Sequence, residues 1–79
     1  MRWFYRIKEK HKDYIEYFYS RESKNYDGII RFYFKDNTIK VIKPCIIDSD
    51  NIFLEGKAIE HFYKVIDENF PDEKSVACG

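Results

Sequence analysis

The sequence predicts a small α+β domain: an antiparallel meander of four strands, with a fifth strand as an open alternative, and one C-terminal amphipathic helix packed on one face of the sheet. Three observations predict this fold class. Apolar residues alternate with polar ones in the first half of the chain, which is typical of strands. Polar turn sequences separate the alternating runs. From residue 57 onward the apolar spacing becomes helical.

The length of the chain limits it to one domain. Its 79 residues are near the lower limit at which a single core holds a fold without disulfides or bound metal. Fifteen residues are aromatic, and each ring that is buried removes roughly 150–250 Å² from water. We expect one domain over residues 1–70 and a flexible tail over residues 71–79, because Pro71 ends the helix and polar residues follow it.

Four runs rich in β-branched and aromatic residues predict the strands. They cover residues 3–8, 14–19, 29–34 and 38–42. Side chains alternate between the two faces of a strand, so every second residue of each run shares a face. The apolar face, called the inner face below, consists of Trp3, Tyr5, Ile7, Ile15, Tyr17, Tyr19, Ile30, Phe32, Phe34, Ile39 and Val41.

Turn sequences predict how these strands pair. Asp36 and Asn37 tolerate positive φ and suit a two-residue hairpin loop, which sets Phe34 opposite Ile39. In the first hairpin, a three-residue tip at 10–12 sets the inner-face residues of the two strands opposite one another. Ile7 then faces Ile15, and Tyr5 faces Tyr17. A slip by one residue would separate these apolar pairs onto different faces.

The C-terminal third predicts the helix that covers the inner face. Gly56 is placed at its cap, because a glycine inside a helix costs about 1 kcal/mol relative to alanine. The segment 52–54 is interpreted as a short edge strand, with the beginning of the helix as the alternative. The helix extends from Lys57 to Asn69, and its apolar stripe consists of Ile59, Phe62, Tyr63, Ile66 and Phe70.

One helix covers only one face of a sheet, so the opposite face should meet solvent or a partner. This outer face combines aromatic and basic side chains, and a contiguous patch of that kind usually marks a contact site. It consists of Phe4, Arg6, Lys8, Tyr14, Glu16, Phe18, Ile29, Arg31, Tyr33, Lys35, Lys40 and Ile42.

Three interpretations of the outer face remain open. Aromatic residues with arginine are enriched at protein interfaces, which favours a protein partner or a homodimer. The same composition can hold single-stranded nucleic acid, with rings stacked on bases and cations on phosphates. In the third interpretation, basic stems lie over the rings and the face is merely solvated. The residues predicted to make the contacts are Phe4, Arg6, Phe18, Arg31, Tyr33 and Lys40.

Charge is unevenly distributed although the total is zero. Residues 1–43 contain eleven lysines and arginines against six acids, whereas residues 44–79 contain three against eight. A zero total argues against general affinity for nucleic acid or membranes, while the basic first half allows a local anionic partner. The short N-terminal apolar run is broken by arginines, and we expect a cytoplasmic protein with no membrane contact.

No candidate residue indicates catalysis. His11 is predicted at a solvated loop tip and His61 on the solvent side of the helix. Cys45 is expected to be a small buried residue and Cys78 to be exposed, with no disulfide between them. Neither cysteine has a neighbouring base that would lower the pKa of its thiol. We therefore expect a protein that is not an enzyme.

The acidic segment 48–55 resembles a calcium loop only superficially. An EF-hand requires glycine at the sixth position and an acid at the twelfth. Counting from Asp48, those positions are Phe53 and Ile59. We expect no metal site and no cofactor.

Overall fold

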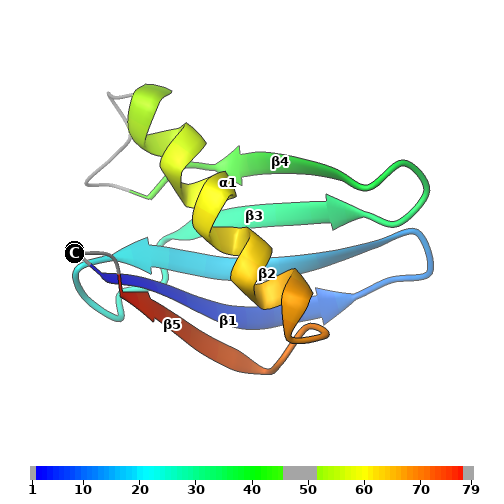
Figure 1. Ribbon diagram of the computed structural model, residues 1–79, viewed down its shortest axis with the longest axis horizontal. Helices are drawn as coiled ribbons and strands as arrows, with labels where there is room; N and C mark the ends of the chain where they lie inside the picture. The colour runs from blue at the N-terminus through cyan, green and yellow to red at the C-terminus, as the bar shows by residue number, and fades with distance from the viewer. Residues whose placement is uncertain (1, 46–51, 78–79) are drawn as a thin grey trace.

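The computed structural model is a five-stranded antiparallel sheet with one helix across one face (Figure 1). It describes residues 2–45 and 52–77, and it describes the side chains of the helix from residue 56 onward. The strands lie in the order β4-β3-β2-β1-β5. The first four form the predicted meander. The elements are β1 (Arg2–Lys10), β2 (Tyr14–Arg21), β3 (Gly28–Tyr33), β4 (Thr38–Lys43), α1 (Ile52–Asp67) and β5 (Glu73–Ala77).

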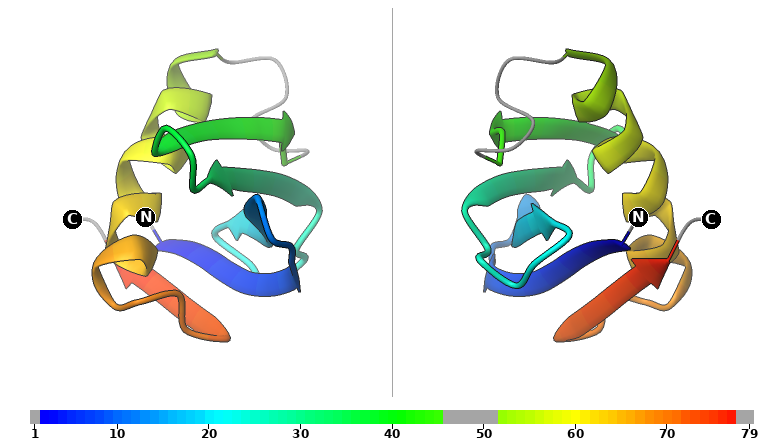
Figure 2. Two further views of the ribbon diagram at one scale, coloured as in Figure 1. Left: turned by 90° about the vertical axis from the view of Figure 1, so that its right-hand side faces the viewer. Right: turned by 90° about the vertical axis from the view of Figure 1, so that its left-hand side faces the viewer.

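The molecule has two layers, as the alternating and helical patterns predict. α1 runs diagonally across the sheet in Figure 1, and both side views in Figure 2 place it on one side of the strands. Because each layer has one apolar face, packing them together removes both faces from water. The predicted α+β fold class is confirmed.

The predicted inner face forms the core. Trp3, Tyr5, Tyr17 and Tyr19 are fully buried. Phe62 of α1 inserts between two of them, and its ring centroid lies 5.4 Å from that of Tyr5 and 5.4 Å from that of Tyr17. Partly buried apolar residues surround this centre: Ile7, Phe34, Ile39, Val41, Ile59, Ile66 and Phe70.

Buried tyrosines also hydrogen-bond the sheet to what covers it. The hydroxyl of Tyr5 donates to the carbonyl of Ala58 at 2.7 Å, and that of Tyr17 donates to the carbonyl of Pro71 at 2.6 Å. Burial raises the pKa of the Tyr17 phenol, which keeps this donor protonated. The polar ends of these rings are therefore satisfied inside the core.

The register of the third hairpin differs from the prediction by two residues. Ile39 lies opposite Phe32, not opposite Phe34, and Tyr33 lies opposite Thr38. The loop therefore has four residues instead of two, with Asn37 in the left-handed region at φ 57°. Because the shift is an even number of residues, every side chain keeps its predicted face.

The first hairpin shows the same even shift. Tyr5 lies opposite Tyr19, and Ile7 lies opposite Tyr17 instead of Ile15. A β-bulge follows, in which Lys8 is the extra residue of β1. In this register Trp3 lies opposite Arg21 and Phe4 opposite Ser20, so Tyr5 and Tyr19 are the one aromatic pair directly opposite each other between β1 and β2.

Three details of the predicted helix are wrong. α1 begins at Ile52, so the interpretation of 52–54 as a strand is incorrect and Gly56 lies inside the helix. Tyr63 is 52% exposed, while Ala58 and Val65 are buried. The stripe that faces the sheet is therefore rotated relative to the prediction.

The chain beyond the helix forms a strand instead of a flexible tail. Asn69 has φ 60°, and the amides of Asn69 and Phe70 donate to the carbonyls of Ile66 and Val65, which ends α1 in a Schellman motif. After Pro71 the chain turns and β5 pairs antiparallel with β1. Val76 of β5 is buried opposite Trp3. Pairing with β1 corrects the expectation of a loose tail for 73–77.

Candidate functional site

A buried acid organises the centre of the outer face. Glu16 of β2 is only 4% exposed, yet it lies on the side without the helix. Its Oε2 accepts hydrogen bonds from Arg31 Nη2 at 2.7 Å and Nε at 2.9 Å, and its Oε1 pairs with Lys8 Nζ at 3.3 Å. The hydrogen bond to Glu16 raises the pKa of Lys8. A carboxylate this far from water is stable because two cations compensate it.

Arg31 connects this acid to two tyrosines. Its guanidinium carbon lies 4.2 Å from the ring centroid of Tyr14 and 5.6 Å from that of Tyr33. Its Nη1 donates to the hydroxyl of Tyr33 at 2.9 Å. The hydrogen bonds to Tyr33 and Glu16 raise the pKa of Arg31. Arg31 and Tyr33, both predicted to contact a partner, are thus brought together, but in this structure they hydrogen-bond to each other.

The two outer-face phenylalanines also lie beside cations. Lys8 Nζ is 6.0 Å from the ring centroid of Phe18, and Lys24 Nζ is 5.8 Å from that of Phe4. Phe18 is half-buried, and Phe4 is 9% exposed. This pairing of rings with cations is what the solvated-face interpretation expects, and it occupies ring faces that a stacked base would use.

The connection between β2 and β3 covers one end of the outer face. It lies on the side of the sheet away from α1 (Figure 2). Glu22 and Tyr26 have φ values of 73° and 51°, a conformation that costs non-glycine residues roughly 1–2 kcal/mol. The conformation brings the Tyr26 ring to 5.8 Å from the guanidinium of Arg6. Phe4 and Arg6, predicted to be open contact residues, therefore lie beneath or beside this loop.

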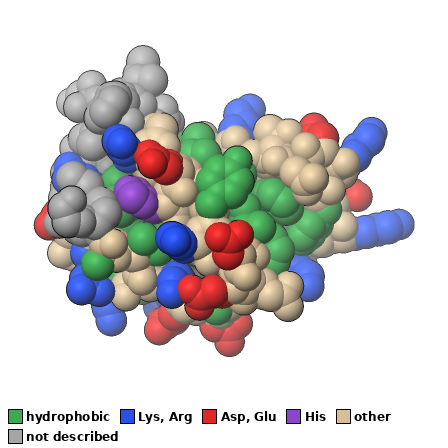
Figure 3. All heavy atoms as spheres, viewed as in Figure 1, with side chains coloured by type: hydrophobic (Ala, Val, Ile, Leu, Met, Phe, Trp, Pro, Cys, Tyr) green, Lys and Arg blue, Asp and Glu red, His purple; other side chains and the backbone are tan. Residues whose placement is uncertain are grey.

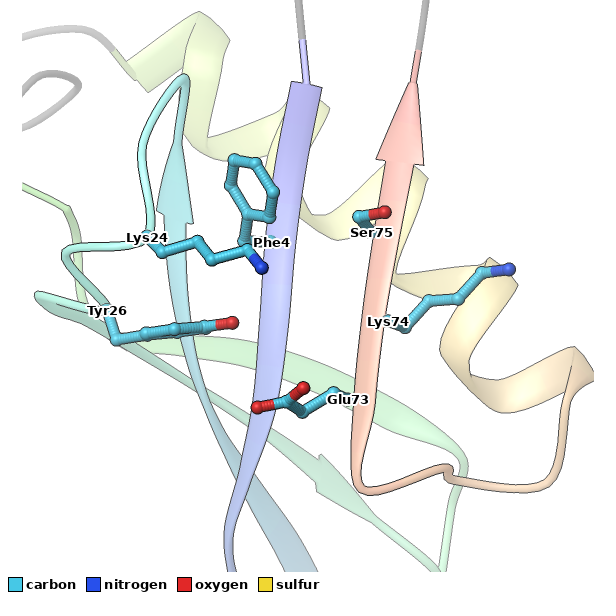
Figure 4. A pocket seen from close by; sticks show the side chains of 6 residues that line it. All are labelled: Phe4, Lys24, Tyr26, Glu73, Lys74 and Ser75. Carbon is cyan, nitrogen blue, oxygen red and sulfur yellow. The ribbon is translucent and has the colours of Figure 1, made fainter.

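A hollow of about 230 Å³ remains between the loop and β5. Figure 4 shows the side chains of Phe4, Lys24, Tyr26, Glu73 and Ser75 around it, while Lys74 extends away. The Lys74 side chain forms an ion pair with Glu68 on the helix side. The residues that line the hollow are Phe4, Lys24, Tyr26, Glu73, Lys74 and Ser75.

The pairing of β1 with β5 and the loop between β2 and β3 together position the polar groups of the hollow. Phe4 lies opposite Ser75, and Arg6 lies opposite Glu73. Arg6 Nε is 3.9 Å from Glu73 Oε1. Burial and the neighbouring Glu73 raise the pKa of Tyr26, whose hydroxyl therefore remains a donor at neutral pH.

The opposite edge of the sheet is different in character. β4 is an edge strand with Lys40 and Lys43 exposed, and Lys35 is exposed in the loop before it. Ile42, the extra residue of a β-bulge, is 40% exposed. In the part of the chain that the structure describes, these three lysines make no ion pair. Lys40, the last predicted contact residue, thus belongs to an open basic edge.

Beside β4, α1 leaves part of the inner face uncovered. Figure 3 shows hydrophobic side chains gathered on this side of the molecule, over the part of the sheet toward the hairpin ends. The β4 members, Ile39 and Val41, are only partly buried. Tyr63 of α1 is the most exposed large hydrophobic residue described. Ile39 and Val41 therefore form a partly exposed apolar strip along the β4 edge.

The alternating pattern of the sequence places the outer face correctly but does not reveal the residues that close it. Lys24 and Tyr26 lie in the polar run 21–27 between two predicted strands, and Glu73 and Ser75 lie in the predicted tail. A lone aromatic residue in the polar run 21–27 was the one available signal. What Tyr26 packs against depends on the backbone of the loop, which no periodicity reveals.

The described histidines and cysteine that could serve in catalysis, His11, His61 and Cys45, each contact different side chains. Nε2 of His11 is 2.8 Å from Glu9 Oε1, and this hydrogen bond lowers the pKa of Glu9. Both side chains are exposed at the end of the first hairpin. His61 packs with its ring centroid 5.8 Å from that of Trp3, so its predicted position on the solvent side is wrong. Cys45 is buried, as expected.

The described residues contain no group of three histidines, cysteines or acids that could hold a metal ion. Cys78, Asp48 and the rest of the acidic turn before residue 52 lie outside the described residues. Within the described part of the chain, no helix is long and apolar enough to span a membrane.

Comparison with protein-family models, curated proteins and solved structures found no match to this chain. Any function must therefore be argued from the geometry of its surfaces.

Proposed function

We propose that this protein is a non-catalytic interaction domain that binds an extended acidic segment of a partner protein along β4. The observation that carries the proposal is the open basic edge of β4 beside an apolar strip. The exposed outer-face residues Lys40 and Ile42 belong to this surface, so the proposal retains one end of the predicted contact face.

The backbone of an edge strand supplies the affinity in this mode of binding. Alternate N–H and C=O groups of an edge strand point away from the sheet, and an added strand can pair with them. Thr38–Lys43 provides six residues for such pairing. Side chains of the added strand would alternate between the apolar strip near Ile39 and Val41 and the lysines of the outer side.

Charge determines which strand fits. Lys35, Lys40 and Lys43 lie along this edge and make no ion pair within the described residues, so an acidic partner gains attraction at each of them. Pairing of β4 with β4 of a second copy would bring lysines together, and like charges on adjacent strands are destabilising. The favoured occupant therefore carries acids on one side and apolar residues on the other.

The test uses two synthetic peptides of eight residues each. One alternates valine with glutamate, and the other alternates valine with lysine. Binding to the ¹⁵N-labelled protein is followed by NMR at low salt. We expect the acidic peptide to perturb amides of residues 38–43 and the basic peptide to have no effect there.

A matched pair of variants separates this site from general attraction of acids to a basic protein. Lys40→Glu reverses a charge on the edge, and Lys12→Glu makes the same change at the exposed end of the first hairpin. The proposal expects at least tenfold weaker binding for Lys40→Glu and little change for Lys12→Glu. Equal losses in the two variants, or perturbations that avoid β4, would overturn it.

A further inference from the structure

We propose that the hollow over β1 and β5 is a second binding site, which takes a small ligand that joins a planar ring to an anionic group. This site lies on the outer face, at the opposite edge of the sheet from β4. It does not depend on the peptide-binding function proposed above. Two halves of the hollow carry the inference, one for the anion and one for the ring.

The anionic half consists of donors from three segments. Arg2 Nη1 donates to Ser75 Oγ at 3.3 Å, which leaves the hydroxyl hydrogen of Ser75 available for another acceptor. Lys24 Nζ lies in the same hollow, between the loop and β1 (Figure 4). A guanidinium, an ammonium and a hydroxyl are the donors that phosphate and carboxylate groups prefer.

The net charge of the surroundings favours an anion over a cation. Arg2, Arg6 and Lys24 border the hollow, and Glu73 is the acid that lines it. Since Arg6 is 3.9 Å from Glu73, the remaining positive charge lies toward Ser75. An anionic group should therefore bind at the Ser75 end.

The ring half is formed by Phe4 and Tyr26. Phe4 projects from β1 and Tyr26 from the loop, and both line the space that Lys24 enters (Figure 4). Lys24 is exposed, so its flexible side chain can move from Phe4 toward a bound anion. A planar ligand would then take its place against aromatic side chains, a contact worth about 1–3 kcal/mol for a base.

The backbone strain at Tyr26 supports this assignment. A tyrosine at φ 51° is uncommon, and its conformation aims the ring across the outer face instead of into solvent. Glu73, at the other end of the hollow from Ser75, is an acceptor for a ring amino group. Ring, amino group and anion together describe a nucleoside monophosphate, the first probe of the test.

The test titrates the full chain with four compounds and follows amide shifts by NMR. Adenosine monophosphate has the ring and the anion, adenosine has only the ring, and inorganic phosphate has only the anion. We expect adenosine monophosphate to bind at least tenfold more tightly than either part, with shifts at residues 2–6, 22–27 and 73–77. Benzoate joins a ring to a carboxylate. If benzoate binds more tightly than the nucleotide, the ligand of the hollow is an aromatic carboxylate, which joins a ring to an anion in the same way.

Two variants and two controls complete the test. Lys24→Gln removes the positive charge of Lys24, and Tyr26→Asn removes the ring while keeping a residue that tolerates positive φ. Each should weaken binding at least fivefold. Lys12→Gln and Tyr63→Asn make the same changes at exposed positions outside the hollow and should leave binding unchanged. The proposal is wrong if phosphate alone binds as tightly as the nucleotide, if Lys12→Gln matches Lys24→Gln, or if no compound binds at millimolar concentration.

Discussion

Gly28 illustrates a packing constraint that acts on one residue. It lies opposite Tyr19 at the beginning of β3, and the Tyr19 ring lies directly over it. A Cβ at position 28 would lie 2.5–2.8 Å from three ring atoms of Tyr19. The ring is fully buried, and its hydroxyl accepts a hydrogen bond from the amide of Cys45 at 3.1 Å, so it cannot move away freely.

We predict that Gly28→Ala lowers the free energy of unfolding by about 1–3 kcal/mol, the usual cost of overpacking a core. Gly56→Ala is the matched control, because its added Cβ meets no atom within 4 Å and the position is helical. That control should stabilise the protein by about 0.5–1 kcal/mol. Urea denaturation of the three proteins measures both effects, and a Gly28→Ala variant as stable as the parent would contradict the packing described for Tyr19.

For single residues, the sequence predicts which side chains are buried better than it predicts their hydrogen-bond partners. Alternation alone places Trp3, Tyr5, Tyr17 and Tyr19 inside the protein, because period two is a local property of a strand. It cannot indicate that Tyr5 donates to Ala58 or Tyr17 to Pro71. Those partners are more than 50 residues away in the chain, and their positions depend on how the helix crosses the sheet.

Among the elements, β5 was the one that sequence patterns could not reveal. Only Val76 of its five residues is buried, and its other members include two charged residues and a serine. A strand with one buried apolar residue has no measurable alternation. Its stability comes instead from backbone pairing with β1 and from Val76 packing opposite Trp3.

The observed beginning of α1, at Ile52, differs from the prediction for a related reason. The cost of about 1 kcal/mol for a glycine in a helix favoured a cap at Gly56. In the structure Gly56 is exposed inside α1, and the helix accepts this cost because Ala58, Phe62 and Val65 are buried beyond it. Tertiary burial outweighs a local propensity, as is usual for helices in proteins.

The role of β5 can be tested by placing a charge on each of its faces. Val76→Asp buries a carboxylate opposite Trp3, whereas Ala77→Asp places the same group at an exposed position. We predict that Val76→Asp lowers the free energy of unfolding by about 2–4 kcal/mol and that Ala77→Asp changes it by less than about 0.5 kcal/mol. Hydrogen exchange should show loss of protection in β5 and along the β1 edge for the first variant alone. Unchanged protection of β5 in Val76→Asp would show that Val76 does not anchor the strand.

For the whole molecule, the predicted faces were correct although two predicted registers were not. Both hairpins shifted by two residues, which moves pairing partners but leaves inside and outside unchanged. The apolar pattern penalises odd shifts strongly and even shifts weakly. The choice among even shifts depends on loop geometry, such as φ 57° at Asn37, and on the bulge at Lys8. The same assignment of faces identifies the residues of the outer face. The ion pairs that Glu16 makes there with Arg31 and Lys8 can be found only from distances in the structure.

Phe62 holds the two layers of the molecule together, because its fully buried ring contacts both Tyr5 and Tyr17 of the sheet. Phe62→Ala should therefore cost about 3–5 kcal/mol, a large fraction of the total stability of a domain this small. Tyr63→Ala, one residue further on α1 and 52% exposed, should cost less than about 1 kcal/mol. Thermal denaturation followed by circular dichroism measures both variants. Because α1 is the one helix in the described part of the chain, loss of its anchor should expose the inner face and abolish cooperative melting near the parent's midpoint. If the two variants melted alike, the helix would not be seated on the sheet through Phe62.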